Sequence, residues 1–533
     1  MNRHRVIHLH SDDNVAIAAN VIRGGSLLQT SADSALDSAS GDPVIASTDI
    51  HPGHKIALVD IDVGEWVRKY GQPIGRASTA IRRGEHVHCH NLVDDHSIDA
   101  RGLGIDPPSS PPPHRGTFEG YVRGDGRVAT RNYIAIISTV NCSATVCHRI
   151  VEAIDQQRRG GQLAWPENVD GVFAATHAGG CAMQFGGEKH EMLTRVLRGY
   201  RNHPNVAAAV VVGLGCEQTT AESISDFAER SNGLSDNRVQ TPLEKSVNAA
   251  TPFLTIQSTG GTAQTIRQGV ETIRKLLPQA AAMKRQVVDA KHLHIAMECG
   301  GSDGYSGWTA NPVLGTVTDR VVAAGGTSVV SETTELYGAE HLLVPRFRDH
   351  PGAVRFLDRL EWWKRHVATY GGTLDHNPSV GNKAGGLSTI TEKSLGAASK
   401  TGSVRIEDFV AYGHRIDRPG LHLMDSPGFD PSSVTGKVAG GANLVLFSTG
   451  RGSCFGCKPV PVIKVATHDR LMHQMPDDMD FSAGGVLHGQ SVEDVGASLW
   501  KFALEVASGR ATHSERLGLG DHEFVPWTIG PVL

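Results

Sequence analysis

The sequence predicts an α/β protein in which a small, mostly β N-terminal domain of β-clip type precedes a large α/β body with mainly parallel sheets, arranged in two lobes. Three observations support this fold class. Short β-prone runs fill residues 1–98, a proline-rich spacer follows, and apolar strands then alternate with helical periods. We therefore expect a β domain at 1–98, a linker at 99–116, a catalytic lobe at 117–370 and a second lobe at 371–533 that completes the site.

The N-terminal segment has the pattern of a compact β domain. Turn signals, such as the prolines and glycines near His51 and Tyr70, separate its short β-prone runs, which lie at residues 5–9, 15–18, 55–59 and 85–88. The proline-rich stretch at residues 105–114 then predicts a semi-rigid spacer. A domain boundary is expected there.

The body begins with strands that are apolar along their whole length, at residues 133–140, 172–176, 207–212 and 293–297. Such runs are typical of parallel strands that are covered on both faces. Helical periods at residues 144–157, 187–200 and 261–277 follow three strand–loop units, which predicts βαβ units. Further strands are expected at 328–331, 422–424 and 443–448, and a crossover between the lobes at 363–403.

Each of the four apolar strands ends near a cysteine set among small residues. The cysteines are Cys142, Cys181, Cys216 and Cys299. Ligands collect outside the carboxyl ends of strands in open α/β sheets, and thiolates placed there bind iron, zinc or an iron–sulfur cluster. The alternative is that each cysteine packs as a small apolar side chain. We expect a shared thiol site at one sheet edge.

Composition narrows the class of protein. Hydrophobic residues make up 39% and charged residues 20%, as in soluble globular proteins, and a net charge of -5 gives no reason to expect nucleic acid. No apolar run approaches the roughly 20 residues that span a bilayer, and the N-terminus lacks the apolar core of a signal peptide. We expect a cytoplasmic protein without a membrane partner, and self-association into a homo-oligomer stays open.

Two smaller groups are also candidates for chemistry. Cys454 and Cys457 form a CxxC pair, which suits half a metal clamp or a redox pair but is equally well an adventitious pair in a glycine loop. His10, His86 and His88 occupy alternating positions of β-prone runs, so paired strands would gather their imidazoles into a site for iron, zinc or manganese. The alternative for the histidines is a solvated polar strand face.

Polar loops supply groups that recognise a hydroxy acid. The cations that can neutralise a carboxylate are Arg131, Lys383, Arg451 and Lys464, and the residues that can bind hydroxyls are Asn132, Asn311, Asn382, Ser302 and Asp303. For the general base we expect His177 or Lys383. Glycine fingerprints of nucleotide sites and a serine nucleophile elbow are absent from the sequence.

Several rare motifs occur in one order along the chain. They are Thr130-Arg-Asn132, Gly213-Leu-Gly-Cys-Glu217, Cys299-Gly-Gly-Ser-Asp303, Thr309-Ala-Asn-Pro312, Asn382-Lys-Ala-Gly-Gly386 and Ser448-Thr-Gly-Arg-Gly452. With them the sequence resembles the altronate/galactarate dehydratase family over essentially its whole length. Residues 1–98 resemble the N-terminal SAF (β-clip) domain of that family.

The resemblance implies a hydro-lyase that removes water from a sugar acid and forms a 2-keto-3-deoxy acid. It also implies a divalent metal, usually taken as Fe²⁺, with Mn²⁺ or an iron–sulfur cluster as alternatives. The histidines at 86–90 resemble altronate more than galactarate dehydratases, so an altronate-like aldonate is the expected substrate. Galactarate, another hydroxy acid with a different leaving group at C3, a non-catalytic sugar-acid-binding protein and a thiol-redox enzyme that uses Cys454 and Cys457 are the alternatives.

Overall fold

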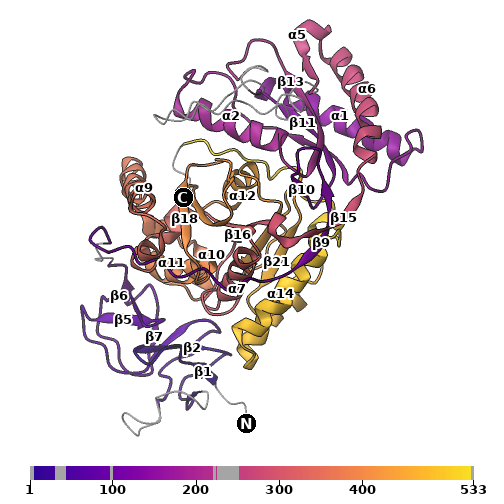
Figure 1. The fold of residues 1–533 in the computed structure, drawn as a ribbon. Helices are drawn as coiled ribbons and strands as arrows, with labels where there is room; N and C mark the ends of the chain where they lie inside the picture. The colour runs from indigo at the N-terminus through magenta and orange to yellow at the C-terminus, as the bar shows by residue number, and fades with distance from the viewer. Residues whose placement is uncertain (1–4, 31–43, 96–99, 220–223, 225–250, 530–533) are drawn as a thin grey trace.

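The computed structural model describes residues 5–30, 44–95, 100–219, 224 and 251–529. The predicted fold class is confirmed, because a β domain precedes an α/β body built on parallel sheets (Figure 1). In Figure 1 the N-terminal domain lies at the lower left and a four-stranded sheet at the upper right, with a seven-stranded sheet between them. No helix within the described ranges is both long enough and apolar enough to cross a membrane.

Eight short strands build the N-terminal domain. They are β1 (Arg5–Ile7), β2 (Val15–Ala18), β3 (Gln29–Thr30), β4 (Lys55–Ala57), β5 (Trp66–Lys69), β6 (Gln72–Ala77), β7 (His86–Val87) and β8 (Leu92–Val93). They form a five-stranded sheet in the order β3-β1-β2-β4-β7 and a three-stranded sheet in the order β5-β6-β8. All neighbours except β1 and β3 are antiparallel. The four β-prone runs predicted here are therefore confirmed as strands.

A four-stranded parallel sheet forms the second unit, in the order β12-β11-β13-β14. Its strands are β11 (Tyr133–Ser138), β12 (Gly171–Ala175), β13 (Val206–Gly213) and β14 (Phe253–Thr255), and its helices are α1 (Asn141–Arg159), α2 (Glu188–Arg201), α5 (Ile256–Thr259) and α6 (Thr262–Ala281). Every residue of β11 is buried because helices cover both faces of the sheet. Ile134 and Ile136 pack with α1 and α6, while Ala135 and Ile137 pack with α2. The predicted βαβ units are thus confirmed.

A small three-stranded sheet closes this second unit at its base. Its strands are β9 (Thr117–Val122), β10 (Val128–Ala129) and β15 (Arg285–Asp289). Because β9 enters the unit and β15 leaves it, their antiparallel pairing holds the two connections together (Figure 1). Within the described part of the proline-rich stretch, residues 103–116 contain no helix or strand.

The third unit is a seven-stranded sheet in the order β18-β19-β17-β16-β20-β21-β22, with all neighbours parallel. Its strands are β16 (His294–Cys299), β17 (Thr327–Val330), β18 (Ile406–Val410), β19 (Gly420–Met424), β20 (Leu444–Thr449), β21 (Val462–Ala466) and β22 (Phe481–Ser482). Its helices are α7 (Ala310–Ala323), α8 (Glu340–Leu343), α9 (His350–Thr369), α10 (Val380–Ala384), α11 (Ile390–Ala398), α12 (Asp430–Ala439), α13 (Asp469–Gln474), α14 (Val492–Ala507) and α15 (His513–Arg516).

This sheet joins strands from both sides of residue 370, where the sequence places a boundary between two lobes. Strands β16 and β17 precede that position, and β16 pairs directly with β20, which follows it. The stretch expected as a crossover, residues 363–403, contains α10 and α11. Asn382 and Gly385 of this stretch contact Ser302 and Asp303, which follow β16 at the carboxyl end of the sheet.

A buried group of three charges joins the N-terminal domain to the body. Lys55 of β4 and Lys69 of β5 each place Nζ 2.8 Å from the carboxylate of Glu392 in α11, and all three side chains are at most 1% exposed. Lys55 also donates to Gly386 O and to Ser388 Oγ. Burial alone would raise the pKa of Glu392, but the two ammonium groups lower it to about 2.

The substitution Glu392→Gln should strongly destabilise the protein, because it leaves two buried ammonium groups without a counter-charge. We expect a loss of about 3–5 kcal/mol in the free energy of unfolding, measured by urea denaturation. The control Glu361→Gln removes an exposed partner of Lys364 and should cost no more than about 1 kcal/mol. Equal losses for the two variants would contradict the structural role of Glu392.

Candidate functional site

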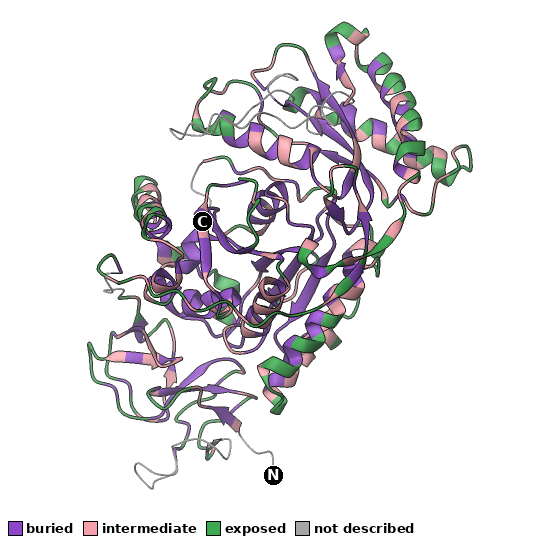
Figure 2. Cartoon of the chain, viewed as in Figure 1, coloured by how far each residue is buried: buried purple, intermediate pink, exposed green. Residues whose placement is uncertain are grey.

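The carboxyl edge of the seven-stranded sheet collects buried carboxylates. Glu298 lies at the end of β16, Glu332 follows β17, and Asp430 begins α12. One carboxylate oxygen from each lies within 4.8 Å of the other two, and within the described ranges this is the one such group of His, Cys, Asp or Glu side chains. Glu298 and Glu332 have no exposed surface, and Figure 2 shows the surrounding strands as buried. We call these three residues the carboxylate centre.

Buried lysines surround the carboxylate centre. Lys437 of α12 contacts Glu298 and donates to Met297 O at 2.7 Å. Lys400 lies 3.3 Å from Glu332, and its side chain is equally buried. These contacts offset part of the cost of burying the carboxylates, which is high for an isolated charge.

A second buried pair lies beside the centre. Lys393 of α11 donates to Glu335 Oε1 at 2.7 Å and to Asn377 Oδ1 at 2.8 Å. Lys393 and Glu335 are 5% and 3% exposed. Glu335 also accepts a hydrogen bond from Asn377 Nδ2 at 2.8 Å. At the carboxyl edge of the seven-stranded sheet, buried acidic side chains are thus paired with buried lysines.

Three carboxylate oxygens at this edge have no hydrogen-bond partner although they are buried. They are Glu298 Oε1, Glu332 Oε1 and Glu335 Oε2. Burial and the neighbouring Glu298 and Glu335 raise the pKa of Glu332, and burial with Glu332 and Glu335 raises the pKa of Asp430 to about 7. Unpartnered buried oxygens are costly, so this edge is suited to bind a cation. An all-oxygen donor set suits a hard or borderline divalent ion.

The motif that follows β16 lies directly against the carboxylate centre. The backbone N–H of Cys299 donates to Glu332 Oε2 at 3.2 Å, and Cys299 Sγ lies 2.7 Å from Ser302 Oγ. Asp303 accepts hydrogen bonds from Ser306 and Thr467. Three predicted site residues, Cys299, Ser302 and Asp303, are thus brought to one place, and all three are buried.

Two other loops that were predicted to carry site residues contact residues 299–303. Asn382 of α10 donates from Nδ2 to Ser302 O at 2.9 Å, and Lys383 follows it with a half-buried side chain. A Cβ atom at Gly385 would lie 3.1 Å from Asp303 Cβ and 3.3 Å from Arg451 Cδ, so the three loops are in contact. Lys383 and the exposed Arg451 are therefore cations at this edge that retain access to solvent.

A second centre lies where the N-terminal domain meets residues 384–388. The imidazoles of His54, His86, His88 and His90 gather there, with the exposed His51 beside His54, and we call the first four the histidine cluster. Burial, the neighbouring histidines and Lys55 lower the pKa of His86 to about 3 and that of His88 to about 4, so both rings are neutral near pH 7. The exposed His10 has no contact with this cluster and instead accepts the N–H of Asp12.

The predicted thiols end on two different sheets. Cys142, Cys181 and Cys216 are exposed at the carboxyl edge of the four-stranded sheet, while Cys299 is buried at the edge of the seven-stranded sheet. The loops of the first three are in contact, because the Gln218 N–H donates to Gly180 O and the Asn141 N–H donates to Gly179 O. Cys457 is buried and Cys454 exposed.

The expected base His177 shares the four-stranded sheet with the exposed thiols. Its Nε2 donates to Ser138 O at 3.0 Å, and its Nδ1 accepts the N–H of Gly179 at 3.1 Å. Burial lowers the pKa of His177 to about 4. Both ring nitrogens are thus bound to backbone, whereas Lys383 lies at the other sheet edge.

Four other predicted binding residues make internal contacts. Arg131 and Asn132 precede β11 at its amino end, where Arg131 pairs with Glu515 and Asn132 donates to Asn168 O and Ala280 O. Asn311 donates to Gly396 O and accepts from Ser448. Lys464 is buried and donates to Phe455 O at 3.0 Å. Their polar groups serve the fold in this structure.

Sequence reasoning missed most of the charges around the carboxylate centre. These are Glu298, Glu332, Glu335, Lys393, Lys400, Asp430 and Lys437. The sequence does contain a signal, since Glu298 and Glu332 each come at the end of an apolar run, as Cys299 does. The sequence gave no reason to select the three lysines, because each lies in a helical segment without a recognisable motif.

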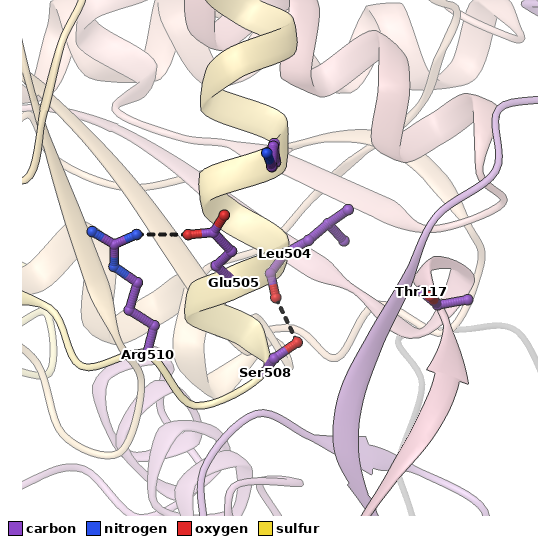
Figure 3. Close-up of a pocket in the computed structure, with 6 residues that line it drawn as sticks. Thr117, Leu504, Glu505, Ser508 and Arg510 are labelled. Atoms are coloured by element: carbon purple, nitrogen blue, oxygen red, sulfur yellow. Dashed lines mark hydrogen bonds and ion pairs between the residues drawn. The ribbon is translucent and has the colours of Figure 1, made fainter.

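A surface hollow between β9 and α14 is shown in Figure 3. It is lined by Thr117, Lys501, Leu504, Glu505, Ser508 and Arg510. Arg510 pairs with Glu505 at 2.6 Å, and Ser508 Oγ donates to Leu504 O. The titratable residues that line this hollow, Lys501, Glu505 and Arg510, all retain exposed surface.

The chain matches three domain families in order. They are described as "Altronate/galactarate dehydratase SAF domain" at residues 4–95, "D-galactarate dehydratase/Altronate hydrolase, second domain" at 120–281, and "D-galactarate/Altronate dehydratase, C-terminal" at 290–532. These limits coincide with the three units of the structure.

Similar whole proteins are also known. An altronate dehydratase of Escherichia coli (strain K12) is 34% identical over 96% of both chains, and a galactarate dehydratase (L-threo-forming) of the same strain is 33% identical over 96% of this chain and 95% of its own. The beta subunit of a (2R)-sulfolactate sulfo-lyase of Chromohalobacter salexigens is 30% identical over 77% of this chain and 96% of its own.

The burial of the thiols predicts how they react with a maleimide under reducing conditions. Cys89, Cys142, Cys181, Cys216 and Cys454 should be labelled in the folded protein, whereas Cys147, Cys299 and Cys457 should be labelled only after unfolding. Burial excludes the reagent and raises the pKa of the three buried thiols. Peptide mass spectrometry measures this, and rapid labelling of Cys299 would contradict its position beside the carboxylate centre.

Proposed function

This chain belongs to the altronate/galactarate dehydratase family and is a sugar-acid dehydratase, a carbon–oxygen lyase; on that premise we propose that its substrate is an altronate-like aldonate. Loss of water from C2 and C3 of such an acid gives a 2-keto-3-deoxy acid. The proton at C2 is weakly acidic, so the reaction needs cations that stabilise the enediolate formed when it leaves. The carboxyl edge of the seven-stranded sheet supplies both cations and buried carboxylates.

The observation that carries the metal part of this proposal is the pair of unpartnered oxygens in the carboxylate centre. Glu298, Glu332 and Asp430 would hold a divalent metal, because their oxygens lie together and Glu298 Oε1 and Glu332 Oε1 lack partners. We propose Fe²⁺ for this site, with Mn²⁺ as the alternative. When bound, the metal supplies a Lewis acid for the C3 hydroxyl and the substrate carboxylate.

Other residues at the edge would bind and orient the substrate. Arg451 offers an exposed guanidinium for a carboxylate, next to the loop that carries Lys383. Lys383 is our candidate for the base that removes the C2 proton, because it lies beside Asn382, which binds the backbone of Ser302. Cys142, Cys181 and Cys216 lie on the other sheet, so a thiolate-bound cluster would be a separate centre from this one.

The relatives are named for three different substrates, so the substrate of this chain has to be identified by experiment. The altronate dehydratase and the galactarate dehydratase share almost the same sequence identity with this chain, 34% and 33%. The third relative is named as a subunit of a sulfo-lyase, and that name denotes a leaving group other than water. A coupled assay across aldonates, aldarates and sulfolactate therefore identifies the substrate. Eight cysteines without a disulfide make the cytoplasm the compartment we propose.

Glu332→Gln should abolish metal binding at the carboxylate centre and reduce formation of the 2-keto-3-deoxy acid by at least about 100-fold. Glutamine keeps the shape of glutamate and can still accept the N–H of Cys299, and the buried Lys400 keeps the neighbouring acids Glu335 and Glu298, so the variant should fold. Mn²⁺ binding, measured by electron paramagnetic resonance, and turnover of altronate are the two measurements.

The matched control is Glu407→Gln. Glu407 is a similarly buried glutamate of the same sheet, and it pairs with Arg405 rather than with the centre. It should retain metal and turnover. Full activity of Glu332→Gln, or full activity of the wild type after removal of all metal by chelation, would refute the metal site.

A further inference from the structure

The histidine cluster lies outside the carboxylate centre and has its own geometry. The ring centroids of His54, His86 and His88 form a triangle with sides of 5.1, 5.0 and 5.4 Å. A metal at about 2.1 Å from an imidazole nitrogen lies roughly 3.2 Å from the ring centre, so three rings around a tetrahedral ion stand about 5 Å apart. The observed triangle has this size.

Hydrogen bonds fix the nitrogen that two of these rings offer. His54 Nε2 donates to the carbonyl of Ala384 at 3.2 Å, which leaves the lone pair of Nδ1 facing His86 Nε2 at 3.0 Å. His88 Nδ1 lies 3.0 Å from Ser388 Oγ, which leaves Nε2 as the nitrogen that it can offer. Metal-binding histidines almost always anchor their second nitrogen in this way.

We propose that His54, His86 and His88 bind a divalent transition-metal ion of the zinc class at the joint between the N-terminal domain and residues 384–388. The ion takes three neutral imidazoles and keeps a fourth position for water. His86 Nε2 carries the proton that faces His54 Nδ1, so binding through Nε2 requires that this proton move to His86 Nδ1 by exchange with solvent, and no net proton is released. One ring must also turn, because the three nitrogens do not all lie within 4.8 Å of one another in the structure.

The surroundings of the cluster favour this class of ion over a hard one. The hydrogen bonds of the three rings go to one another, to Ala384 O and to Ser388 Oγ, and the buried acid Glu392 close by is already bound to Lys55 and Lys69. Imidazole nitrogens without carboxylates select zinc, cobalt, nickel or copper over magnesium and calcium. His86 and His88 are only half buried, so an ion can reach them from solvent and a ring has room to turn.

The site is separate from the carboxylate centre because helix α11 stands between them. Glu392 of that helix faces the lysines beneath the histidine cluster, while the next residue, Lys393, faces Glu335. An ion on the three histidines would fasten the N-terminal domain to the loop that carries Lys383, Ala384 and Ser388. It would therefore act on the position of that loop rather than on the substrate.

The test uses the full-length protein with Co²⁺ as the probe, since tetrahedral Co²⁺ has an intense visible absorption. We expect the wild type to show this band and Zn²⁺ to displace it, with Co²⁺ bound about 100-fold more weakly in His86→Ala and in His88→Ala. His473→Ala, which removes an exposed histidine of α13, is the matched control and should bind as the wild type does.

Two further variants separate this proposal from the dehydratase mechanism. Glu332→Gln should keep the Co²⁺ band, since it changes only the carboxylate centre. His86→Cys should retain binding and add a thiolate-to-cobalt charge-transfer band, which a merely structural histidine would not produce. A wild-type spectrum without the tetrahedral band, a band that survives both alanine variants, or a band lost in Glu332→Gln overturns the proposal.

Discussion

The bond between Glu392 and two lysines of the N-terminal domain is the contact on which the rest of the arrangement depends. A buried carboxylate is tolerated only when it is paired, and here both partners arrive from β4 and β5 of another domain. Helix α11 is buried along all nine of its residues, so its position is fixed from every side. Its next residue, Lys393, points about 100° further round the helix and reaches Glu335 at the sheet edge.

The two groups of side chains that we propose as metal sites lie on opposite sides of that helix, and they differ in chemistry. The carboxylate centre offers oxygen, much of it unpartnered, within a ring of lysines. The histidine cluster offers neutral nitrogen at a domain joint. The two proposed sites therefore differ in donor atom, which is oxygen in one and imidazole nitrogen in the other.

The spacing of apolar residues along the sequence predicted the fold well, because it indicates which side chains of a strand or helix are buried. A run such as residues 133–138 is apolar on both faces, and only a strand inside a parallel sheet buries both. The same patterns placed Cys299, Ser302 and Asp303 at a carboxyl edge, where the structure has them. They gave no means of telling which strands share a sheet, so Cys142, Cys181 and Cys216 were expected beside Cys299 although they end on another sheet.

The sequence by itself determined the fold class, the main buried strands and the first three long helices of the body, the family, and a sheet edge at which candidate site residues gather. All of these depend on short-range periodicity or on motifs that are contiguous in the chain. The tertiary structure decided which charges meet. Glu298, Glu332 and Asp430 are separated by 132 residues from first to last, and His54 joins His86 and His88 only because β4 pairs with β7. Such pairings arise from the order of strands in a sheet, which no local pattern encodes.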